Sequence, residues 1–438
     1  MLLTCIGSLM GDLNLGKRVC PMSLARLARL AVCLSFFCAA VLAGAETQNS
    51  TSHTQKAASV KKPRKRVRRK RRRRHTVVAH RSQRRVVATT TRAAVIHTVR
   101  HRRRRHRIFR SPWDTPTYAD STLGDNPDGE DLEVRRAAVA ALGRHNGAVV
   151  VADPETGRIL SIVNQKLALQ GAYEPCSTVK LVVSLASLSE GIVNPVARVR
   201  LSRRFSTNMT YALAYSVNAY FARLGEILGF DRVEKYAKLF GLGQRAGLDI
   251  LGESPGYLAD EPPASGVGMM TSFGDGIRLT PLQLASIVST IANGGTLYYL
   301  QYPRSQEEVD KFVPRIKREL DIANFIPEIK PGLMGAVEYG TARRAVYNPS
   351  APIFGKTGTC TDTTNPGVHL GWFGSFTAVG DKKLVVVVLL TGGFGVSGPI
   401  ASGIGGAVYH NLAAEHYFGP QRNTLPTTLI SMRDASSQ

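Results

Sequence analysis

Residues 173–180 read Tyr-Glu-Pro-Cys-Ser-Thr-Val-Lys, a stretch that predicts both a helix start and a reactive pair of side chains. Pro175 suits the first turn of a helix, which would then carry Ser177 and Lys180. Residues three apart lie on one face of a helix, so the Lys180 amine can point at the Ser177 hydroxyl. A serine needs a nearby base to become a nucleophile, and lysine can serve if burial or a neighbouring cation lowers its pKa. Taken alone, a Ser-x-x-Lys sequence often arises by chance on a helix surface.

A second motif, Ser216-Val217-Asn218, follows further along the chain. The Ser216 hydroxyl could relay a proton to a leaving amine, and the Asn218 amide could hold a substrate carbonyl. The alternative is a simple turn between two helices.

A third motif, Lys356-Thr357-Gly358-Thr359, follows the extended residues 352–354. A lysine and two hydroxyls on a strand can bind a carboxylate, and Gly358 would let a substrate backbone approach closely. A backbone N–H near Thr359 could pair with that of Ser177 to form an oxyanion hole. The alternative is an exposed strand end with a solvated lysine.

The order of predicted elements indicates the fold class. Apolar, β-branched runs at 148–152 and 158–163 predict two strands joined by a turn. Helical patterns follow at 177–190, 209–228, 231–240 and 280–293, and strands return at 370–379 and 384–390 before a closing helix at 402–418. Strands at both ends with helices between them predict one antiparallel sheet built from both chain ends, with helices packed on it.

The three motifs in this order resemble the transpeptidase domain of penicillin-binding proteins and, more distantly, serine β-lactamases. The likeness covers about residues 132–420 and extends to further stretches, at 147–159, 240–249, 272–285, 292–295, 340–342 and 372–374. The resemblance implies an α+β fold, with an antiparallel five-stranded sheet flanked by helices and an all-helical subdomain.

The resemblance also implies an activity and a set of site residues. Ser177 would attack the penultimate D-Ala carbonyl of a peptidoglycan stem peptide, and an amine (transpeptidation) or water (carboxypeptidation) would resolve the acyl-enzyme. β-Lactams would acylate Ser177 as substrate mimics, and no metal or cofactor would be required. The implied catalytic residues are Ser177, Lys180 and Ser216. The implied substrate-binding residues are Asn218, Lys356, Thr357, Gly358 and Thr359, the lysine and the threonines receiving the terminal carboxylate.

Two cysteines depart from the family pattern. Cys176 stands where the family usually has glycine, and Cys360 follows the Lys-Thr-Gly-Thr motif. Both positions flank the family's active site, so we predict a disulfide between them, resembling a bridge in some class A carbapenem-hydrolysing β-lactamases. The alternative is two free, buried thiols.

Two other functions remain open. β-Lactam hydrolysis needs a carboxylate that activates a water, and Glu253 lies near the expected place, although Tyr257 stands where a partner asparagine belongs. The segment 252–256 instead resembles a structural part of penicillin-binding proteins. A non-catalytic wall-binding protein is the third possibility, and the intact Ser/Lys/Ser/Lys set argues against it.

The net charge of +25 comes almost entirely from one segment. Residues 61–110 hold 23 Lys and Arg and no Asp or Glu. We therefore expect 46–110 to be disordered. Residues 111–131 are rich in Pro, Asp and Gly, so we expect a linker there, and we expect 421–438 to be a flexible tail. Residues 61–108 lack the aromatic side chains that stack on single-stranded nucleic acid, so the expected partners are anionic envelope polymers or lipid head groups rather than nucleic acid.

The N-terminus predicts export. Arg26 and Arg29 precede the uncharged, largely apolar residues 30–45, which end in the small residues Ala43-Gly44-Ala45. We expect 1–45 to be a signal peptide, with an uncleaved membrane anchor at 24–45 as the alternative. The protein is therefore expected in the periplasm or elsewhere in the cell envelope.

Overall fold

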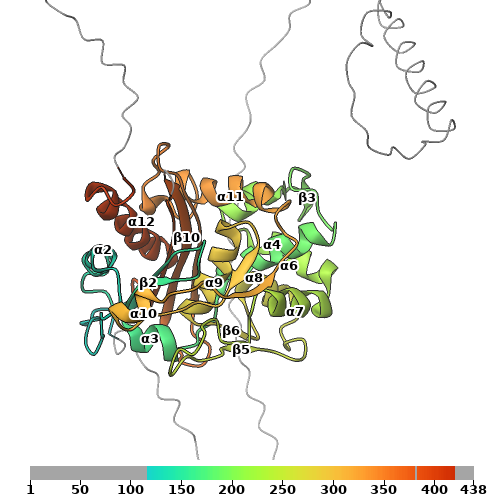
Figure 1. Ribbon diagram of the computed structural model, residues 1–438. Helices are drawn as coiled ribbons and strands as arrows, with labels where there is room; N and C mark the ends of the chain where they lie inside the picture. Colours follow the sequence, from blue (N-terminus) through green and yellow to red (C-terminus); the bar gives the residue numbers. More distant parts are fainter. Residues whose placement is uncertain (1–115, 380–381, 420–438) are drawn as a thin grey trace, which may run out of the picture. The chain divides into compact units, whose positions relative to one another are not determined.

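A five-stranded antiparallel sheet lies at the centre of the computed structural model, which describes residues 116–379 and 382–419 (Figure 1). The strands are ordered β2-β1-β11-β10-β9, so the first two strands of the domain meet the last three. Their bounds are β1 Gly147–Ala152, β2 Ile159–Val163, β9 Ile353–Thr361, β10 His369–Val379 and β11 Lys382–Gly392. This arrangement confirms the predicted sheet built from both ends of the domain.

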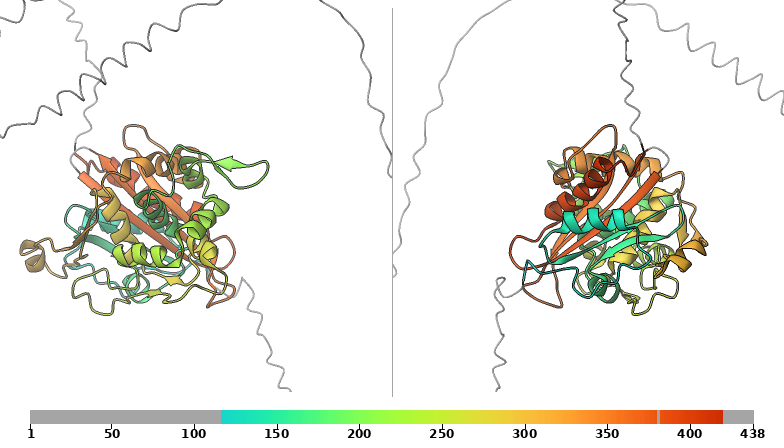
Figure 2. Two further views of the ribbon diagram at one scale, coloured as in Figure 1. Left: turned by 90° about the vertical axis from the view of Figure 1, so that its right-hand side faces the viewer. Right: turned by 60° about the vertical axis from the view of Figure 1, so that its left-hand side comes forward.

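The strands β1, β2 and β11 are buried on both faces of the sheet, which explains why they are almost continuously apolar. Val150 of β1 and Val387 of β11 belong to one core, which includes α9 (Pro281–Ala292). Their neighbours Val149 and Val388 pair with each other and face the opposite core. That second core is closed by α2 (Leu132–Leu142) and α12 (Gly398–Ala414), which lie side by side on the same face (Figure 2).

The middle of the chain forms the predicted helical region. Its helices are α4 Lys180–Ser189, α5 Met209–Ala214, α6 Asn218–Leu228, α7 Phe230–Leu239 and α8 Val267–Phe273, and α4 is preceded by a 3-10 turn, η1, at Cys176–Val179. The remaining helical elements are α3 Gln165–Gln170, α10 Gln306–Asp310, α11 Ile326–Glu338 and the 3-10 turn η2 Arg343–Ala345. Three small two-stranded sheets pair β3 (Val199–Arg200) with β4 (Ser206–Thr207), β5 (Tyr257–Leu258) with β6 (Ile277–Arg278), and β7 (Thr296–Tyr298) with β8 (Ile316–Glu319).

The single helix predicted over 209–228 is wrong. The structure breaks it after Ala214, and α6 begins only at Asn218. Ser216 has a φ of 56°, a left-handed conformation that a continuous helix excludes. The apolar pattern hides this break because both short helices bury the same side. The turn places Ser216 at the junction, where its side chain is free to point away from either helix.

The stretch predicted as a linker packs against the domain from residue 116 onward. Arg135 of α2 forms ion pairs with Asp125 at 2.9 Å and with the buried Glu130 at 3.0 Å. The Glu130 carboxylate also accepts hydrogen bonds from the Ser161 hydroxyl and the Ile162 N–H of β2. The acidic residues that suggested a solvated linker therefore anchor this segment to the edge of the sheet.

Several predicted segments lie outside the described residues. These are the signal peptide or anchor, the polybasic segment, the beginning of the linker and the C-terminal tail, at 1–45, 46–110, 111–115 and 421–438. Within the part that is described, no helix combines the length and apolar character needed to cross a bilayer.

Candidate active site

Ser177 lies in the 3-10 turn η1 and Lys180 begins α4, so the two side chains stand one turn apart. Lys180 Nζ is 2.9 Å from Ser177 Oγ. Thr178 stabilises this turn, because its hydroxyl donates a hydrogen bond to the Pro175 carbonyl at 2.7 Å. The predicted pairing of the hydroxyl with the amine is present in the structure.

Lys180 is buried and meets more acceptors than a charged amine can satisfy. Its Nζ lies 3.0 Å from both the Ser216 hydroxyl and the Ser216 carbonyl, and it contacts Asn218 Oδ1 as well as Ser177. Burial, and then the charge of Lys356, lowers the pKa of Lys180 to about 6. At neutral pH the amine is therefore mostly uncharged, and its lone pair can accept the Ser177 proton.

The second motif meets the first at this amine. Ser216 stands in the turn between α5 and α6, and Asn218 begins α6. Both side chains contact Lys180 Nζ, and the centroid of the Phe221 ring lies 5.3 Å from the same atom. The Ser216 hydroxyl is thus placed to exchange a proton with the Lys180 amine.

The third motif forms one wall of a cleft of about 220 Å³. Thr357 and Thr359 are two residues apart on β9, so their side chains share the face that borders the cleft. The Thr359 hydroxyl accepts a hydrogen bond from the Gly398 N–H at 2.8 Å. The cleft is lined by Ser177, Ser216, Asn218, Phe273, Thr341, Thr357, Thr359 and Pro399.

Lys356 does not border the cleft with the threonines. It is fully buried, and its Nζ donates to the Thr357 carbonyl at 3.1 Å. Burial lowers the pKa of Lys356 to about 7. In the structure, the positive charge of Lys356 helps to lower the pKa of Lys180. Direct contact between Lys356 and a substrate carboxylate stays a prediction.

Gly358 has a different structural role from the one expected. A Cβ atom at this position would lie 2.9 Å from the Pro175 carbonyl oxygen and 3.2 Å from the Thr178 Cγ2 atom. Only glycine therefore lets β9 pack directly against the turn that carries Ser177. This close approach is between two parts of the protein, and the approach of a substrate backbone to Gly358 stays a prediction.

Thr341 and Pro399 are among the cleft residues that were not assigned a role from the sequence. The Thr341 and Thr357 hydroxyls are 2.6 Å apart, so Thr341 helps to orient the β9 wall. The stretch 340–342 was noted only as part of the family pattern, and nothing marked Pro399. Both come from segments that reach the cleft only through tertiary packing.

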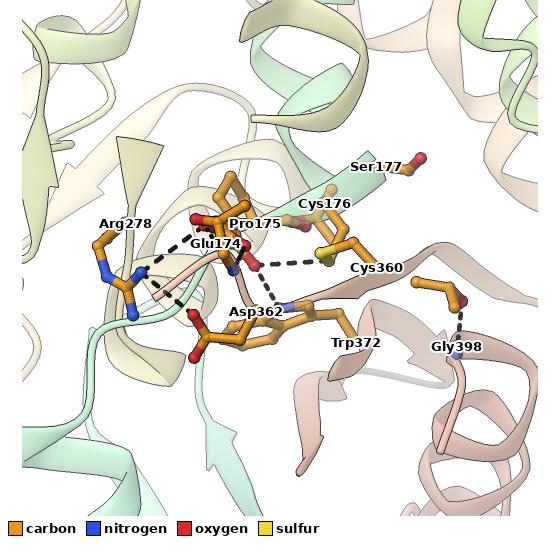
Figure 3. The surroundings of a disulfide bond; sticks show 12 residues. Glu174, Pro175, Cys176, Ser177, Arg278, Cys360, Asp362, Trp372 and Gly398 are labelled. Atoms are coloured by element: carbon orange, nitrogen blue, oxygen red, sulfur yellow. Dashed lines mark hydrogen bonds and ion pairs between the residues drawn. A yellow bond between two sulfur atoms is a disulfide. The ribbon is translucent and has the colours of Figure 1, made fainter. Parts of the chain in front are cut away.

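The nucleophile turn is tied to the end of β9 by more than packing (Figure 3). A disulfide joins Cys176 to Cys360 in the structure, with their Cα atoms 5.6 Å apart. Beneath it, Trp372 Nε1 donates to the Glu174 carbonyl at 2.8 Å. Arg278 lies between two carboxylates, 3.4 Å from Asp362 and 3.7 Å from Glu174.

Glu253 is not placed to activate a water in the cleft. Its carboxylate accepts backbone N–H groups of Ala246 at 2.7 Å and of Gly247 at 3.0 Å, and it does not border the cleft. Among the described residues that line the cleft, none is an aspartate or a glutamate. This supports the structural interpretation of 252–256 and weighs against the β-lactamase alternative.

Comparison with known proteins agrees with this geometry. A family model described as penicillin binding protein transpeptidase domain matches residues 147–408. The chain is 31% identical over 299 residues to stage V sporulation protein D of Bacillus subtilis, covering 60% of this chain and 46% of that protein. It is 23% identical over 354 residues to peptidoglycan D,D-transpeptidase MrdA of Haemophilus influenzae, covering 62% and 54%. The chain therefore spans about half the length of the curated relatives that it matches.

A solved structure shares the fold. The apo transpeptidase domain of penicillin-binding protein 3 from Burkholderia pseudomallei superimposes with a TM-score of 0.57 at 20% sequence identity, covering 65% of this chain and 94% of that domain. This similarity confirms the predicted α+β class. Because the family model also matches more than half of the sequence, the chain belongs to the penicillin-binding protein transpeptidase domain family.

Proposed function

We propose that the protein is a serine D,D-transpeptidase that acts on peptidoglycan stem peptides through an acyl-enzyme on Ser177. The observation that carries the proposal is the 2.9 Å approach of the Lys180 amine, whose pKa is lowered to about 6, to the Ser177 hydroxyl. The name peptidoglycan D,D-transpeptidase that several relatives bear supports the same reaction.

In the first half of the reaction, Ser177 Oγ attacks the carbonyl carbon of the penultimate D-Ala while Lys180 Nζ accepts the hydroxyl proton. The backbone N–H groups of Ser177 and Thr359 hold the oxyanion. The peptide C–N bond then breaks, the Ser216 hydroxyl passes a proton to the departing D-Ala amine, and Lys180 reprotonates Ser216. This proton route uses the 3.0 Å contact between Lys180 Nζ and Ser216 Oγ.

In the second half, an amine of a neighbouring stem attacks the ester carbonyl, a new amide forms, and Ser177 recovers its proton. Water in place of the amine gives carboxypeptidation instead. Asn218 would bind the substrate backbone, and Thr357 and Thr359, backed by Lys356, would hold the terminal carboxylate. β-Lactams would enter the same cleft and acylate Ser177.

Labelling with a fluorescent penicillin tests the proposal directly. The wild-type protein should carry one covalent label that survives denaturation, and Ser177→Ala should carry none, with Ser202→Ala as an exposed serine control. Release of D-Ala from a pentapeptide should follow the same pattern. Repeated turnover of a chromogenic cephalosporin by the wild-type protein would contradict the transpeptidase assignment and favour hydrolysis.

We further propose that the protein is exported, with 1–45 as signal peptide or anchor, and that the Cys176–Cys360 disulfide forms in the oxidising envelope. The charge of 61–110 supports binding to anionic envelope polymers or lipid head groups there. Electrostatic binding weakens with salt, so the protein should leave isolated envelopes as the ionic strength rises. Retention that salt does not change would overturn this part of the proposal.

A further inference from the structure

Three exposed tyrosine rings stand in a row next to the catalytic cleft. Tyr211, Tyr215 and Tyr339 are exposed by 45%, 43% and 41%. The Tyr211 and Tyr215 ring centroids are 4.4 Å apart, and those of Tyr215 and Tyr339 are 5.9 Å apart. We call these three residues the tyrosine row. A run of aromatic surface left in water is unusual enough on a globular protein to indicate a binding site.

The tyrosine row comes from the same segments as two of the cleft residues. Tyr215 directly precedes Ser216, and Tyr339 stands two residues before Thr341; both of these neighbours line the cleft. Two members of the row are therefore held by the same short segments that carry Ser216 and Thr341.

The same packing that positions the cleft also holds the rings. Tyr211 and Tyr215 are one helical turn apart, and Tyr339 follows the last residue of α11. The Thr341 N–H donates to the Ala214 carbonyl at 3.1 Å, which joins the end of α5 to the segment after α11. A side chain at Gly340 would collide with that carbonyl. The rings are thus fixed in place before any ligand arrives, which lowers the entropy cost of binding.

The chemistry of the tyrosine row fits a neutral, hydroxylated ring rather than an ion. Aromatic faces offer apolar area, and none of the described residues hydrogen-bonds to the three phenol hydroxyls. Each hydroxyl is therefore available to a ligand. A pyranose sugar presents what such a surface can bind, namely a face of C–H bonds with hydroxyl and acetamido groups around the edge.

We propose that the tyrosine row binds the amino-sugar glycan to which the donor stem peptide is attached, an inference that rests on the proposed transpeptidase function. A stem residue spans at most about 3.6 Å, so the four residues between the reacting bond and the sugar reach about 14 Å from Ser177. The path toward the row is short: Tyr215 directly precedes Ser216, and Lys180 Nζ contacts both the Ser216 hydroxyl at 3.0 Å and the Ser177 hydroxyl at 2.9 Å.

A different surface lies close by in the sequence and must be separated from the row. The β3–β4 hairpin leads into α5 and exposes Arg198, Arg200, Arg203 and Arg204, and none of these has a carboxylate partner among the described residues. The arginine hairpin would favour the carboxylates of a substrate, and its contribution would weaken with salt.

The test compares two donors on the full chain: a pentapeptide, and the same pentapeptide attached to a disaccharide of N-acetylglucosamine and N-acetylmuramic acid. We expect the kcat/KM for D-Ala release to be about tenfold higher for the disaccharide form, on the scale of one or two ring contacts. In the double variant Tyr211→Ala/Tyr339→Ala this ratio should fall to near one. The matched variant Tyr257→Ala, which removes an exposed tyrosine outside the row, should keep the wild-type ratio.

Conservative replacement separates binding from folding. Tyr211→Phe/Tyr339→Phe keeps the ring faces and should retain most of the preference, and thermal melting should show all variants folded. Equal kcat/KM for the two donors in the wild-type protein would overturn the inference. So would a preference that disappears in about 0.5 M NaCl, or in Arg203→Ala/Arg204→Ala, while surviving the loss of the tyrosines.

A binding measurement stands apart from the reaction. The tetramer of N-acetylglucosamine, a neutral glycan without peptide, should shift the ring proton signals of the tyrosine row in Ser177→Ala protein, and not in Tyr211→Ala/Tyr339→Ala. If neither donor releases D-Ala, the proposed function is wrong, and the titration still tests whether the tyrosine row binds a glycan. If both donors react and the tetramer does not bind, the glycan site fails and the function stands.

Discussion

Lys180 Nζ lies 2.9 Å from Ser177 Oγ and is made a base by burial and by the charge of a second lysine behind it. That second lysine, Lys356, has no carboxylate neighbour among the described residues to stabilise its charge. The two amines therefore titrate as a coupled pair, and the chemistry depends on one being neutral while the other is charged.

This pair predicts a bell-shaped pH profile. Acylation by penicillin should rise with pH as Lys180 loses its proton, with an apparent pKa of about 6. It should fall again as Lys356 loses its charge, with an apparent pKa of about 7, because the neutral amine no longer attracts the carboxylate. Stopped-flow measurement of the second-order rate constant between about pH 4.5 and 9 checks both limbs.

Lys356→Arg is the matched control for that profile. A guanidinium stays charged throughout this range, so the alkaline limb should disappear while the acid limb remains. A rate that is flat across the range in the wild-type protein would contradict the assignment of Lys180 as base.

The disulfide predicts a large, redox-dependent stability. It closes a loop of 184 residues in sequence separation, for which the chain-entropy estimate is about 5 kcal/mol. Reduction with dithiothreitol should lower the melting temperature of the wild-type protein by on the order of 10 °C. Cys176→Ser/Cys360→Ser should melt at the reduced value, and dithiothreitol should not lower it further. Equal melting of oxidised and reduced wild-type protein would show that the bond contributes nothing.

Residues 116–131 are held to the domain by Arg135, so the stability of the domain should depend strongly on this side chain. Arg135→Ala leaves the buried Glu130 without its cation and should cost about 3–5 kcal/mol of unfolding free energy. Arg223→Ala, which removes an exposed pair with Glu226, should cost no more than about 0.5 kcal/mol. Urea unfolding measures the free energy of unfolding of both variants. If Arg135→Ala lowers it by no more than Arg223→Ala does, the ion pair between Arg135 and Glu130 does not stabilise the domain.

Thr341 is expected to act as a positioning residue for Thr357. Thr341→Val keeps the volume, removes the 2.6 Å contact between hydroxyls, and should lower the efficiency of penicillin acylation about tenfold. The loss of acylation efficiency should appear mainly as a higher KM for penicillin, because Thr357 belongs to the part of the cleft that is expected to bind the carboxylate. Thr341→Ser restores a hydroxyl and should recover most of the efficiency. An unchanged KM in Thr341→Val would remove Thr341 from the site.

Much of the fold could be predicted because it follows local rules. The valine-rich strands Gly147–Ala152 and Lys382–Gly392 have the composition of strands buried on both faces, and the Ser177–Lys180 pairing follows from helical spacing. The family resemblance added the pairing of two distant cysteines, which spacing alone does not reveal.

The rest depends on contacts between distant parts of the chain. The left-handed Ser216 is an exception, because local hydrogen bonds close α5 there, from the Ser216 N–H to the Leu213 carbonyl and from the Val217 N–H to the Ala212 carbonyl; the helical periodicity of 209–228 still gives no sign of it. Thr341 becomes part of the cleft only because α11 packs beside α5. Asp125 and Glu130 looked like solvated loop residues, since their partners Asn164 and Ile162 lie more than thirty positions away.

The strand order also determines when, during synthesis, Ser177 can become reactive. β1 is made early, but its neighbour β11 is the last strand of the sheet to leave the ribosome. Until β11 is made, no strand of the sheet bridges β1 to the β9–β10 half, which carries Thr357 and Thr359. We therefore expect the complete Ser177 site to form only when translation of the domain is nearly complete.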